Sequence, residues 1–329
     1  MNEKYVSLII PVYNEEKYID SCIDSLLKQD YPQDYMEWIF VDGMSLDNTM
    51  NILNYYYDKY PKLIKILKNS QKTVPYAMNI GIENSKGEYI IRLDAHAEYK
   101  NDYISKCVYY LETTDAENVG GITITRGKGF TGNTIAKMLS CKFGVGNSDF
   151  RTNGRSGYVD TVPFGAFRKE IFDKLGGYDE RLTRNQDNEM NYRIRNNGGK
   201  IYLASDIISY YYCRDSIRGI VNMAMTNGKW NIITMNLCPG SMGIRHFIPL
   251  GFLLSLVILP LLSLFSNLFA YLFLIEVILY FILDLLFSYK QSDNFKDFLF
   301  LMILFPIFHI SYGFGSLIGL YSIAKNEIS

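Results

Sequence analysis

The chain has 329 residues, of which 48% are hydrophobic, and its formal net charge is −1 at pH 7. A charge this close to zero excludes a general electrostatic attraction to nucleic acid, and the length suits one large domain with an appendage. The five cysteines are scattered and include no C-x-x-C pair, which argues against a disulfide framework or a zinc site. The apolar run near the N-terminus is too short for a signal sequence, so we expect the front of the protein to stay in the cytoplasm.

Strands and helices are predicted to alternate through the first hundred residues. Strands are predicted at 5–13, 36–42, 62–67 and 87–94, and helices at 15–30, 45–60 and 74–85. This order predicts a mostly parallel, Rossmann-like α/β sheet with helices on both faces. Because ligands of such sheets bind beyond the carboxyl ends of the strands, the polar segments 11–15, 42–47 and 94–96 are expected to converge on one crevice. Neither G-x-G-x-x-G nor a P-loop motif is present, so a classical dinucleotide fold is not supported.

The C-terminal part contains three long apolar runs. They cover residues 247–265, 268–289 and 298–323, and each is long enough to span a bilayer. The link between the second and third runs carries Lys290 and Lys296, which places it in the cytoplasm by the preference of positive residues for that side. We therefore predict a cytoplasmic catalytic domain at 1–213, an amphipathic interface segment at 214–245 and a membrane domain at 246–329.

Two acidic residues interrupt the second apolar run. Glu276 and Asp284 are eight positions apart, near one face of a helix, and a charge in a bilayer is costly unless it faces protein. Packing against a neighbouring helix or subunit is favoured over a transport role. Trp230, just before the apolar runs, is expected at the membrane interface.

Four stretches carry polar residues where a strand is predicted to end or a helix to begin. They read SLIIPVYNEEKYIDSCIDSLLKQDYP, WIFVDGMSLDNT, AMNIGIENSKGEYIIRLDAHAEY and FGAFRKEIFDKLGGYDERLTRNQDNEMNYRIRNNGGKIYL. In this order they resemble the family 2 glycosyltransferases, over roughly residues 5–215. The resemblance implies a GT-A fold and transfer of a sugar from a nucleotide diphosphate with inversion. RLDAHA combined with RNQDNEMNYRIR is most similar to bacterial exopolysaccharide transferases of the succinoglycan type.

The resemblance implies a nucleotide site at the first two strand ends. Pro11, Tyr13 and Glu15 would lie along the nucleoside, with Tyr13 against the base and Glu15 near the ribose. The same loop also reads as a helix N-terminus, and both readings can hold together. Asp42 would accept a hydrogen bond from the uracil N–H, and a buried carboxylate needs such a partner. The family often has an acidic residue next to this position, where this chain has Gly43.

Asp94 and His96 stand where the family usually carries Asp-x-Asp. Residues i and i+2 of an extended strand face the same side, so we expect the two side chains to grip one Mn²⁺ or Mg²⁺ ion that bridges the donor phosphates. The imidazole favours Mn²⁺ more than a carboxylate would. The alternative is that His96 hydrogen-bonds a phosphate directly and no metal binds. Arg92 is expected to pair with Asp94 or another carboxylate, and a structural salt bridge is the favoured reading.

Asp187 matches the family's general base, which takes the proton of the acceptor hydroxyl. An aspartate at the start of a helix is held in place and stays ionised, although alone it would read as a helix cap. Gln186 stands where the family usually has Glu. Glu189 and Arg193 are expected to support the base and the diphosphate, and Lys229 could take the role of the arginine in the family's Gln-x-x-Arg-Trp motif.

The sequence as a whole predicts a multi-pass protein of the bacterial inner membrane. It would transfer a sugar from a UDP-sugar to a lipid-linked saccharide in exopolysaccharide synthesis. The alternatives are a polyprenyl-phosphate glycosyltransferase, a processive polysaccharide synthase and a non-catalytic sugar-nucleotide-binding scaffold. Residues 126–157, rich in Gly and Ser, are expected to form a mobile loop over the crevice. The sequence leaves the sugar, the linkage and the oligomeric state, including a homo-oligomer, open.

Overall fold

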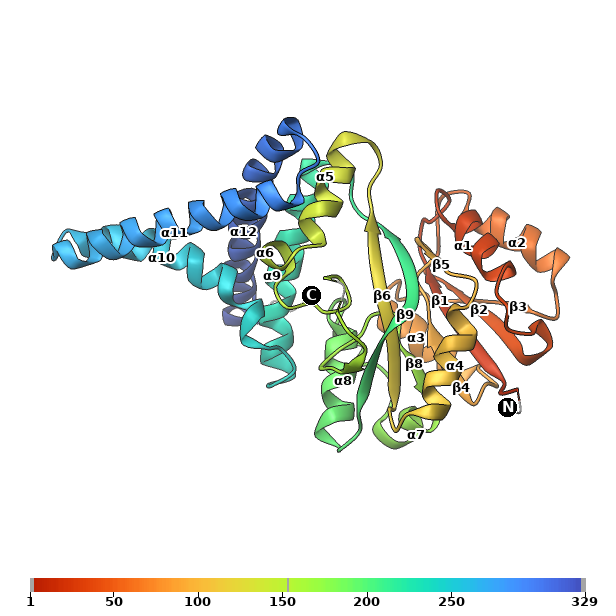
Figure 1. Ribbon diagram of the computed structural model, residues 1–329. Coiled ribbons are helices and arrows are strands. Elements are labelled where there is room, and N and C mark those ends of the chain that lie inside the picture. The colour runs from red at the N-terminus through yellow and green to blue at the C-terminus, as the bar shows by residue number, and fades with distance from the viewer. Residues whose placement is uncertain (1–2, 153, 327–329) are drawn as a thin grey trace. The chain divides into compact units, whose positions relative to one another are not determined.

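A computed structural model describes residues 3–152 and 154–326 (Figure 1). The chain divides into two compact units. The sheet unit comprises residues 1–124 and 153–211, and the helical unit comprises 125–152 and 212–329. The chain therefore passes from one unit to the other three times.

Residues 125–152 differ from the sequence prediction, which placed them in the catalytic domain as part of a mobile loop. They form helices α5 (Gly129–Leu139) and α6 (Lys142–Val145) and belong to the helical unit. Ile135, Met138 and Leu139 of α5 are buried, so apolar packing outweighs the high Gly and Ser content that suggested mobility.

Within the described residues, nine strands form one sheet. They are β1 (Val6–Val12), β2 (Met36–Asp42), β3 (Ile64–Lys68), β4 (Tyr89–Arg92), β5 (Ala97–Tyr99), β6 (Asn118–Arg126), β7 (Gly157–Tyr158), β8 (Ala166–Arg168) and β9 (Ile201–Tyr212). The main order is β3-β2-β1-β4-β8-β6-β9-β5, with β7 paired to β9. The predicted parallel arrangement is confirmed for β3, β2, β1 and β4. The pairs β4–β8, β8–β6, β9–β5 and β7–β9 are antiparallel.

Helices cover both faces of the parallel part, as the alternating order predicts. The helices α1 (Ile19–Leu27), α2 (Thr49–Lys59) and α4 (Tyr103–Thr113) bury one apolar core with the sheet. Leu8 and Ile10 of β1 belong to that core, whereas Ile9 faces α3 (Val74–Glu83) on the other side. A Cβ on Gly81 of α3 would lie 2.4 Å from Ile9, so glycine permits this close packing. The largely buried parallel strands between two helical layers place their carboxyl ends at one edge.

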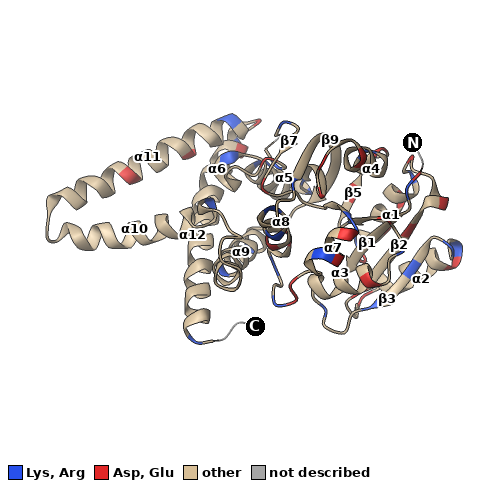
Figure 2. Cartoon of the chain, turned by 90° about the horizontal axis from the view of Figure 1, so that it is seen from below, with Lys and Arg blue, Asp and Glu red and all other residues tan. Residues whose placement is uncertain are grey.

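The helical unit contains α9 (Ile217–Leu237), α10 (Ile248–Ser263), α11 (Asn267–Gln291) and α12 (Phe295–Ala324). The helices α11 and α12 are long and apolar enough to cross a membrane, by length and composition. The first predicted run, 247–265, corresponds to α10, which is apolar but has 16 residues. In Figure 2, α10 and α11 carry few charged residues along their length. Three crossings stay a prediction.

Close contact between α9 and α12 depends on glycine. A Cβ on Gly315 would lie 2.0 Å from the Met225 carbonyl oxygen, and one on Gly319 would lie 2.6 Å from the Lys229 carbonyl oxygen. The two glycines are four residues apart, the spacing that brings helix backbones close together in membrane proteins. Gly228 of α9 makes the reciprocal approach, because its Cβ would lie 2.1 Å from the Tyr312 carbonyl oxygen. The predicted amphipathic segment is thus a helix packed onto the last apolar helix.

Polar side chains of the apolar helices pair with one another. The Ser255 hydroxyl donates to Glu276, and the Ser288 hydroxyl donates to Asp284 at 2.9 Å. The Ser255 bond joins α10 to α11, and Asp284 is buried within the helical unit, so both observations agree with the packing role preferred for the two acidic residues. Trp230 is buried within the helical unit, at 6% exposure, so the prediction that its ring faces the membrane interface is wrong.

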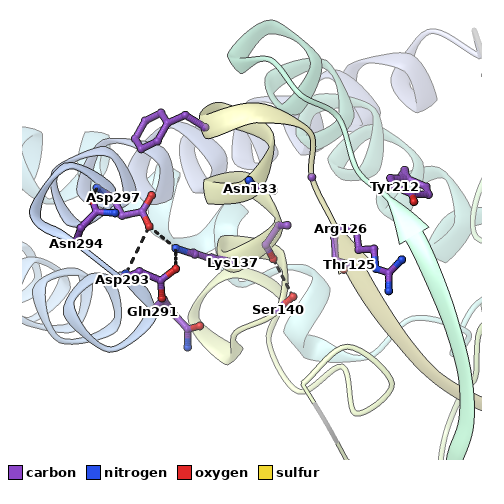
Figure 3. Close-up of a pocket in the computed structure, with 13 residues that line it drawn as sticks. Thr125, Arg126, Asn133, Lys137, Ser140, Tyr212, Gln291, Asp293, Asn294 and Asp297 are labelled. Carbon is purple, nitrogen blue, oxygen red and sulfur yellow. Dashed lines mark hydrogen bonds and ion pairs between the residues drawn. The ribbon is translucent and has the colours of Figure 1, made fainter.

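The link between α11 and α12 is fixed to α5 by a group of polar side chains, which we call the Lys137 cluster (Figure 3). The Lys137 ammonium points from α5 to Asp293, at 2.6 Å, and to Asp297. Asp297 also accepts a hydrogen bond from Thr134 at 2.9 Å. Asn294 caps α12 by accepting from the Asp297 N–H at 3.0 Å. The cluster lines a cavity of about 700 Å³.

Candidate active site

The loops that follow β1 and β2 are joined by hydrogen bonds. Asn14 has a positive φ of 54°, its N–H donates to the Ser45 hydroxyl at 2.9 Å, and its side-chain oxygen accepts from Leu46 N–H at 2.8 Å. Asn tolerates the left-handed conformation better than most residues. Thr49 of α2 accepts from the Glu15 N–H at 2.8 Å. The two strand ends therefore form one connected polar edge.

Asp47 has a structural role in this edge. Its carboxylate accepts from the Thr49 N–H at 3.1 Å, the Thr49 hydroxyl at 2.6 Å and the Glu16 N–H at 3.2 Å. These bonds tie the start of α2 to the loop that follows β1.

Asp42, at the end of β2, is 4% exposed and finds its partners in the following turn. The N–H groups of Met44 and Ser45 donate to its carboxylate at 3.1 and 3.2 Å. Because a carboxylate offers about four acceptor positions, these two bonds leave capacity for a ligand N–H. The Tyr13 ring lies beside Gly43, where a Cβ would be 3.3 Å from the ring. Gly43 thus leaves room for an aromatic surface that is 42% exposed and suited to a nucleobase.

Pro11 lies inside β1, opposite Val41 of β2. Its missing N–H would cost a hydrogen bond in most central strands. Pro11 lies directly before the turn that carries Tyr13, and a nucleotide role for Pro11 stays a prediction.

The Asp94 and His96 pair lies in a turn, not in an extended strand. β4 ends at Arg92 and β5 begins at Ala97. The argument that residues two apart face one side of a strand is therefore wrong for this pair. Tyr99 holds the turn, because its hydroxyl accepts from the Asp94 N–H at 2.8 Å.

His96 pairs with Glu15 of the first loop. Its Nδ1 lies 3.0 Å from Glu15 Oε1, and its ring meets the Tyr211 ring edge to face. This contact joins the predicted ribose-binding residue to the predicted metal ligand. Within the described residues, no group of three or more His, Cys, Asp and Glu side chains gathers to hold a metal. Asp94 and His96 still supply an oxygen and a nitrogen donor on one turn, which fits an ion whose remaining ligands come from a donor diphosphate.

Arg92 joins Asp94 to Asp187. Its Nη2 lies 3.3 Å from Asp94 Oδ1, and its Nη1 contacts Asp187 Oδ1 directly. A pairing with Asp94 or another carboxylate was expected, and the second carboxylate is that of Asp187, 95 positions away. Burial raises the pKa of Asp187, and the Arg92 guanidinium opposes that rise. The Asp187 side chain is 32% exposed, so an acceptor hydroxyl can reach it.

Asp187 occupies the first turn of α8 (Gln186–Asn196), and this helix is firmly held. Glu189 pairs with Arg193 at 2.6 Å, and Arg193 also donates to the Leu175 and Gly177 carbonyls at 2.7 Å. Because its guanidinium is engaged in these bonds, Arg193 is better placed to support the helix that carries the base than to contact the diphosphate.

Within the sheet unit, two asparagine side chains connect α8 to β6 and to the loop that follows β7. Asn118 of β6 donates to Asn191 at 2.6 Å, and Asn191 donates to Thr161 at 2.8 Å. Gln186, which replaces the family's Glu, is buried at 6% exposure and leaves its side-chain oxygen without a hydrogen-bond partner among the described residues. Lys229 lies on α9 in the helical unit, and its role toward the diphosphate stays a prediction.

Sequence reasoning missed Tyr99 and Asn191. Tyr99 follows the Asp94 turn by five positions, and an aromatic hydroxyl that close to a candidate ligand was a usable signal. Asn191 gave no signal, because its partner Asn118 lies on a strand 73 positions earlier.

Comparison with known proteins gives the same assignment as these motifs. The sequence profile described as Glycosyl transferase family 2 matches residues 7–176, more than half of the chain. The chain belongs to glycosyl transferase family 2. It is therefore a glycosyltransferase, and its relatives act in polysaccharide and glycan biosynthesis.

Two curated relatives cover most of this glycosyltransferase. One is a dolichyl N-acetyl-α-D-glucosaminyl phosphate 3-β-D-2,3-diacetamido-2,3-dideoxy-β-D-glucuronosyltransferase from Methanococcus voltae, 29% identical over 77% of this chain and 80% of its own. The other is the succinoglycan biosynthesis protein ExoA from Rhizobium meliloti, 26% identical over 74% of both chains.

Solved structures confirm the GT-A fold. A mannosyltransferase from Pyrobaculum calidifontis, in complex with GDP-Man and Mn²⁺, superposes with a TM-score of 0.66 at 16% identity. That match covers 98% of this chain and 88% of the mannosyltransferase. Staphylococcus aureus TarS superposes with a TM-score of 0.51 at 17% identity, covering 95% of this chain and 55% of TarS.

Proposed function

We propose that this protein is a membrane-attached, inverting glycosyltransferase that moves a sugar from a UDP-sugar to a lipid-linked saccharide. The observation that carries the proposal is the contact of Arg92 with both Asp94 and Asp187. It brings the carboxylate expected to act as base next to the carboxylate expected at the donor diphosphate. The product would feed a surface polysaccharide such as an exopolysaccharide.

In the proposed reaction, Asp187 accepts the proton of the acceptor hydroxyl as its oxygen attacks the anomeric carbon. The new C–O bond forms on the face opposite the diphosphate, the bond to the diphosphate oxygen breaks, and UDP leaves with the electron pair. A base whose pKa is raised by burial, yet whose carboxylate stays ionised beside Arg92, suits proton transfer near neutral pH.

Asp94 and His96 would hold the divalent metal, which when bound neutralises charge on the departing diphosphate. Glu15 would orient His96 through their 3.0 Å contact and so fix which ring nitrogen is available. Tyr13 would face the nucleobase, and Asp42 would accept from its N–H. Related folds have been solved with GDP-Man and Mn²⁺ and with UDP, which supports a nucleotide donor of this class.

The proposed acceptor is supported by a relative, and the proposed location by the helical unit. The relative from Methanococcus voltae is named for a sugar acceptor on dolichyl phosphate, which supports a lipid-linked acceptor here. The Lys137 cluster fixes the α11–α12 link to α5, in a segment whose two ends both continue into the sheet unit. This supports placing that link on the same side of the membrane as the catalytic unit, and we propose that this side is the cytoplasm because the link carries Lys290 and Lys296. The cell membrane of a bacterium remains the proposed site.

The test uses the full chain in lipid nanodiscs. Release of the nucleotide would be measured with UDP-glucose, UDP-N-acetylglucosamine, UDP-glucuronic acid and GDP-mannose, each with and without Mn²⁺. Acceptors would be polyprenyl phosphate and a polyprenyl-diphosphate-linked N-acetylglucosamine. We expect turnover with one UDP-sugar and the lipid-linked sugar, dependent on Mn²⁺ and lost in Asp187→Asn.

Other outcomes would revise the proposal in a defined way. Turnover with GDP-mannose alone would overturn the UDP assignment, and transfer to polyprenyl phosphate would make the enzyme a polyprenyl-phosphate glycosyltransferase. Nucleotide binding without turnover on any acceptor, in wild type and variant alike, would favour a non-catalytic scaffold.

A further inference from the structure

Arg92 has an unusual position for a charged residue. It ends β4, a strand that pairs with β1 on one side and with β8 on the other. Its N–H donates to the Gly165 carbonyl at 3.0 Å, and its side chain is 7% exposed. The backbone that carries the guanidinium is therefore fixed at the centre of the sheet.

Two different nitrogens of this guanidinium meet two different carboxylates. Nη2 meets Asp94 and Nη1 meets Asp187, while Nε has no hydrogen-bond partner within the described residues. One carboxylate would be enough to balance the buried charge. The second comes from a helix that is far away in sequence, so the rigid, planar fork sets the separation between the two carboxylates.

Without Arg92, each of the two carboxylates would be held only by its own segment of the chain. Asp94 lies in a turn that Tyr99 holds. Asp187 lies on α8, which is held where Asn118 donates to Asn191 and where Arg193 donates to the Leu175 carbonyl. No other described contact joins the two side chains. Like charges that face each other repel, and the electrostatic effect of Asp94 already raises the pKa of Asp187.

We propose that Arg92 is the positioning residue that aligns the base Asp187 with the donor-side carboxylate Asp94. The inference rests on the proposed function, because it needs Asp187 to act as the base. A lysine at this position restores one charge but cannot hold two carboxylates in a fixed plane. Geometry and charge can therefore be separated by substitution.

The experiment compares Arg92→Lys and Arg92→Ala with wild type, Asp187→Asn and Lys200→Met in nanodiscs. Lys200 pairs with Asp115 on the surface, so its variant controls for loss of one positive charge. Turnover is measured as UDP release with the donor and acceptor found by the assay above, and donor binding as calorimetry with UDP and Mn²⁺. Adding about 20 mM guanidinium, a concentration far below denaturing levels, tests chemical rescue of Arg92→Ala.

We expect Arg92→Lys to lower kcat by about 10- to 100-fold, within the range of a misplaced general base, with donor KM changed by less than about threefold. Guanidinium should restore part of the activity of Arg92→Ala, and ammonium should not. Wild-type kcat in Arg92→Lys would overturn the inference, as would an effect confined to KM.

The two failures are distinguishable. If Asp187→Asn keeps wild-type activity, the proposed base is wrong and both ideas fall. If Asp187→Asn is inactive but Arg92→Lys is normal, the proposed function stands and only the positioning role falls. Since Arg92→Lys keeps the charge, it is expected to fold even if Arg92→Ala does not, and it then decides the question alone.

Discussion

The contact between α9 and α12 gives a sharp prediction for Gly315→Ala. The added Cβ would lie 2.0 Å from the Met225 carbonyl oxygen and 2.6 Å from the Met225 Cα. These atoms are backbone, so they cannot rotate away as a side chain could, and the two helices must separate.

The magnitude follows from two opposing effects. Overpacking a close contact costs about 1–3 kcal/mol, whereas replacing a helical glycine with alanine gains about 1 kcal/mol in helix propensity. Because the clash is with backbone, we expect the upper part of the range, and a net loss of about 1–2 kcal/mol. For a unit of this size the loss corresponds to about 2–4 °C in Tm per kcal/mol.

Gly251→Ala is the matched control. Gly251 lies in α10 of the same unit, and a Cβ built there meets nothing within 4 Å. We expect an unchanged or slightly higher Tm. The assay is thermal loss of helical circular dichroism of the full chain in one detergent. Equal Tm values for the two variants would refute the argument that glycine is needed for this helix contact.

Four further predictions concern the site and the Lys137 cluster. Asp187→Asn should lower kcat by about 10²–10⁴-fold and leave UDP binding, measured by calorimetry, within about twofold of wild type. Because the proposed base Asp187 would have to be deprotonated, and burial raises its pKa, the acidic fall of kcat should lie at higher pH than for an ordinary aspartate, and a fall at an ordinary value would contradict this. His96→Ala should weaken UDP binding about 10- to 100-fold in Mn²⁺ and little without metal; equal loss in both conditions would instead favour direct phosphate contact. Lys137→Met should destabilise the helical unit by about 1–3 kcal/mol, because Asp297 is 6% exposed, and the surface variant Lys200→Met should leave Tm unchanged. Equal Tm values for the two lysine variants would show that the cluster adds no stability.

The parallel half of the sheet could be predicted because its signal is local. Continuous apolar runs between helical segments identified β1, β2, β3 and β4, and β2 agrees at both ends with the predicted range. The polar residues after these strands follow from the same pattern, since parallel strands end at one edge.

The turn at Asp94 and His96 could not be predicted in this way. The two-residue period predicts side-chain direction only within a strand, and β4 ends two residues before Asp94. Tyr99 decides the turn through a bond to the Asp94 N–H, and hydrogen bonds between a side chain and the backbone leave no periodic trace.

Long-range contacts account for the remaining differences. The Arg92 contact with Asp187 joins segments 95 positions apart, and the sequence could not identify which carboxylate besides Asp94 would be the partner. Residues 125–152 are rich in glycine, but their partners lie on α12, which only the folded helical unit brings together with α5.

The three chain passages between the units have a practical consequence for dissecting the protein. Ending the chain at residue 211 would remove α9 and α12 but leave α5, whose Ile135, Met138 and Leu139 would lose their covering. Such a fragment would expose apolar surface and tend to aggregate. A soluble version of the sheet unit therefore requires two changes together, a stop at residue 211 and a short polar linker in place of residues 125–152. Conversely, a protease that cuts the chain at one of the three passages leaves the other two passages intact. Each cut therefore leaves parts of both units covalently connected.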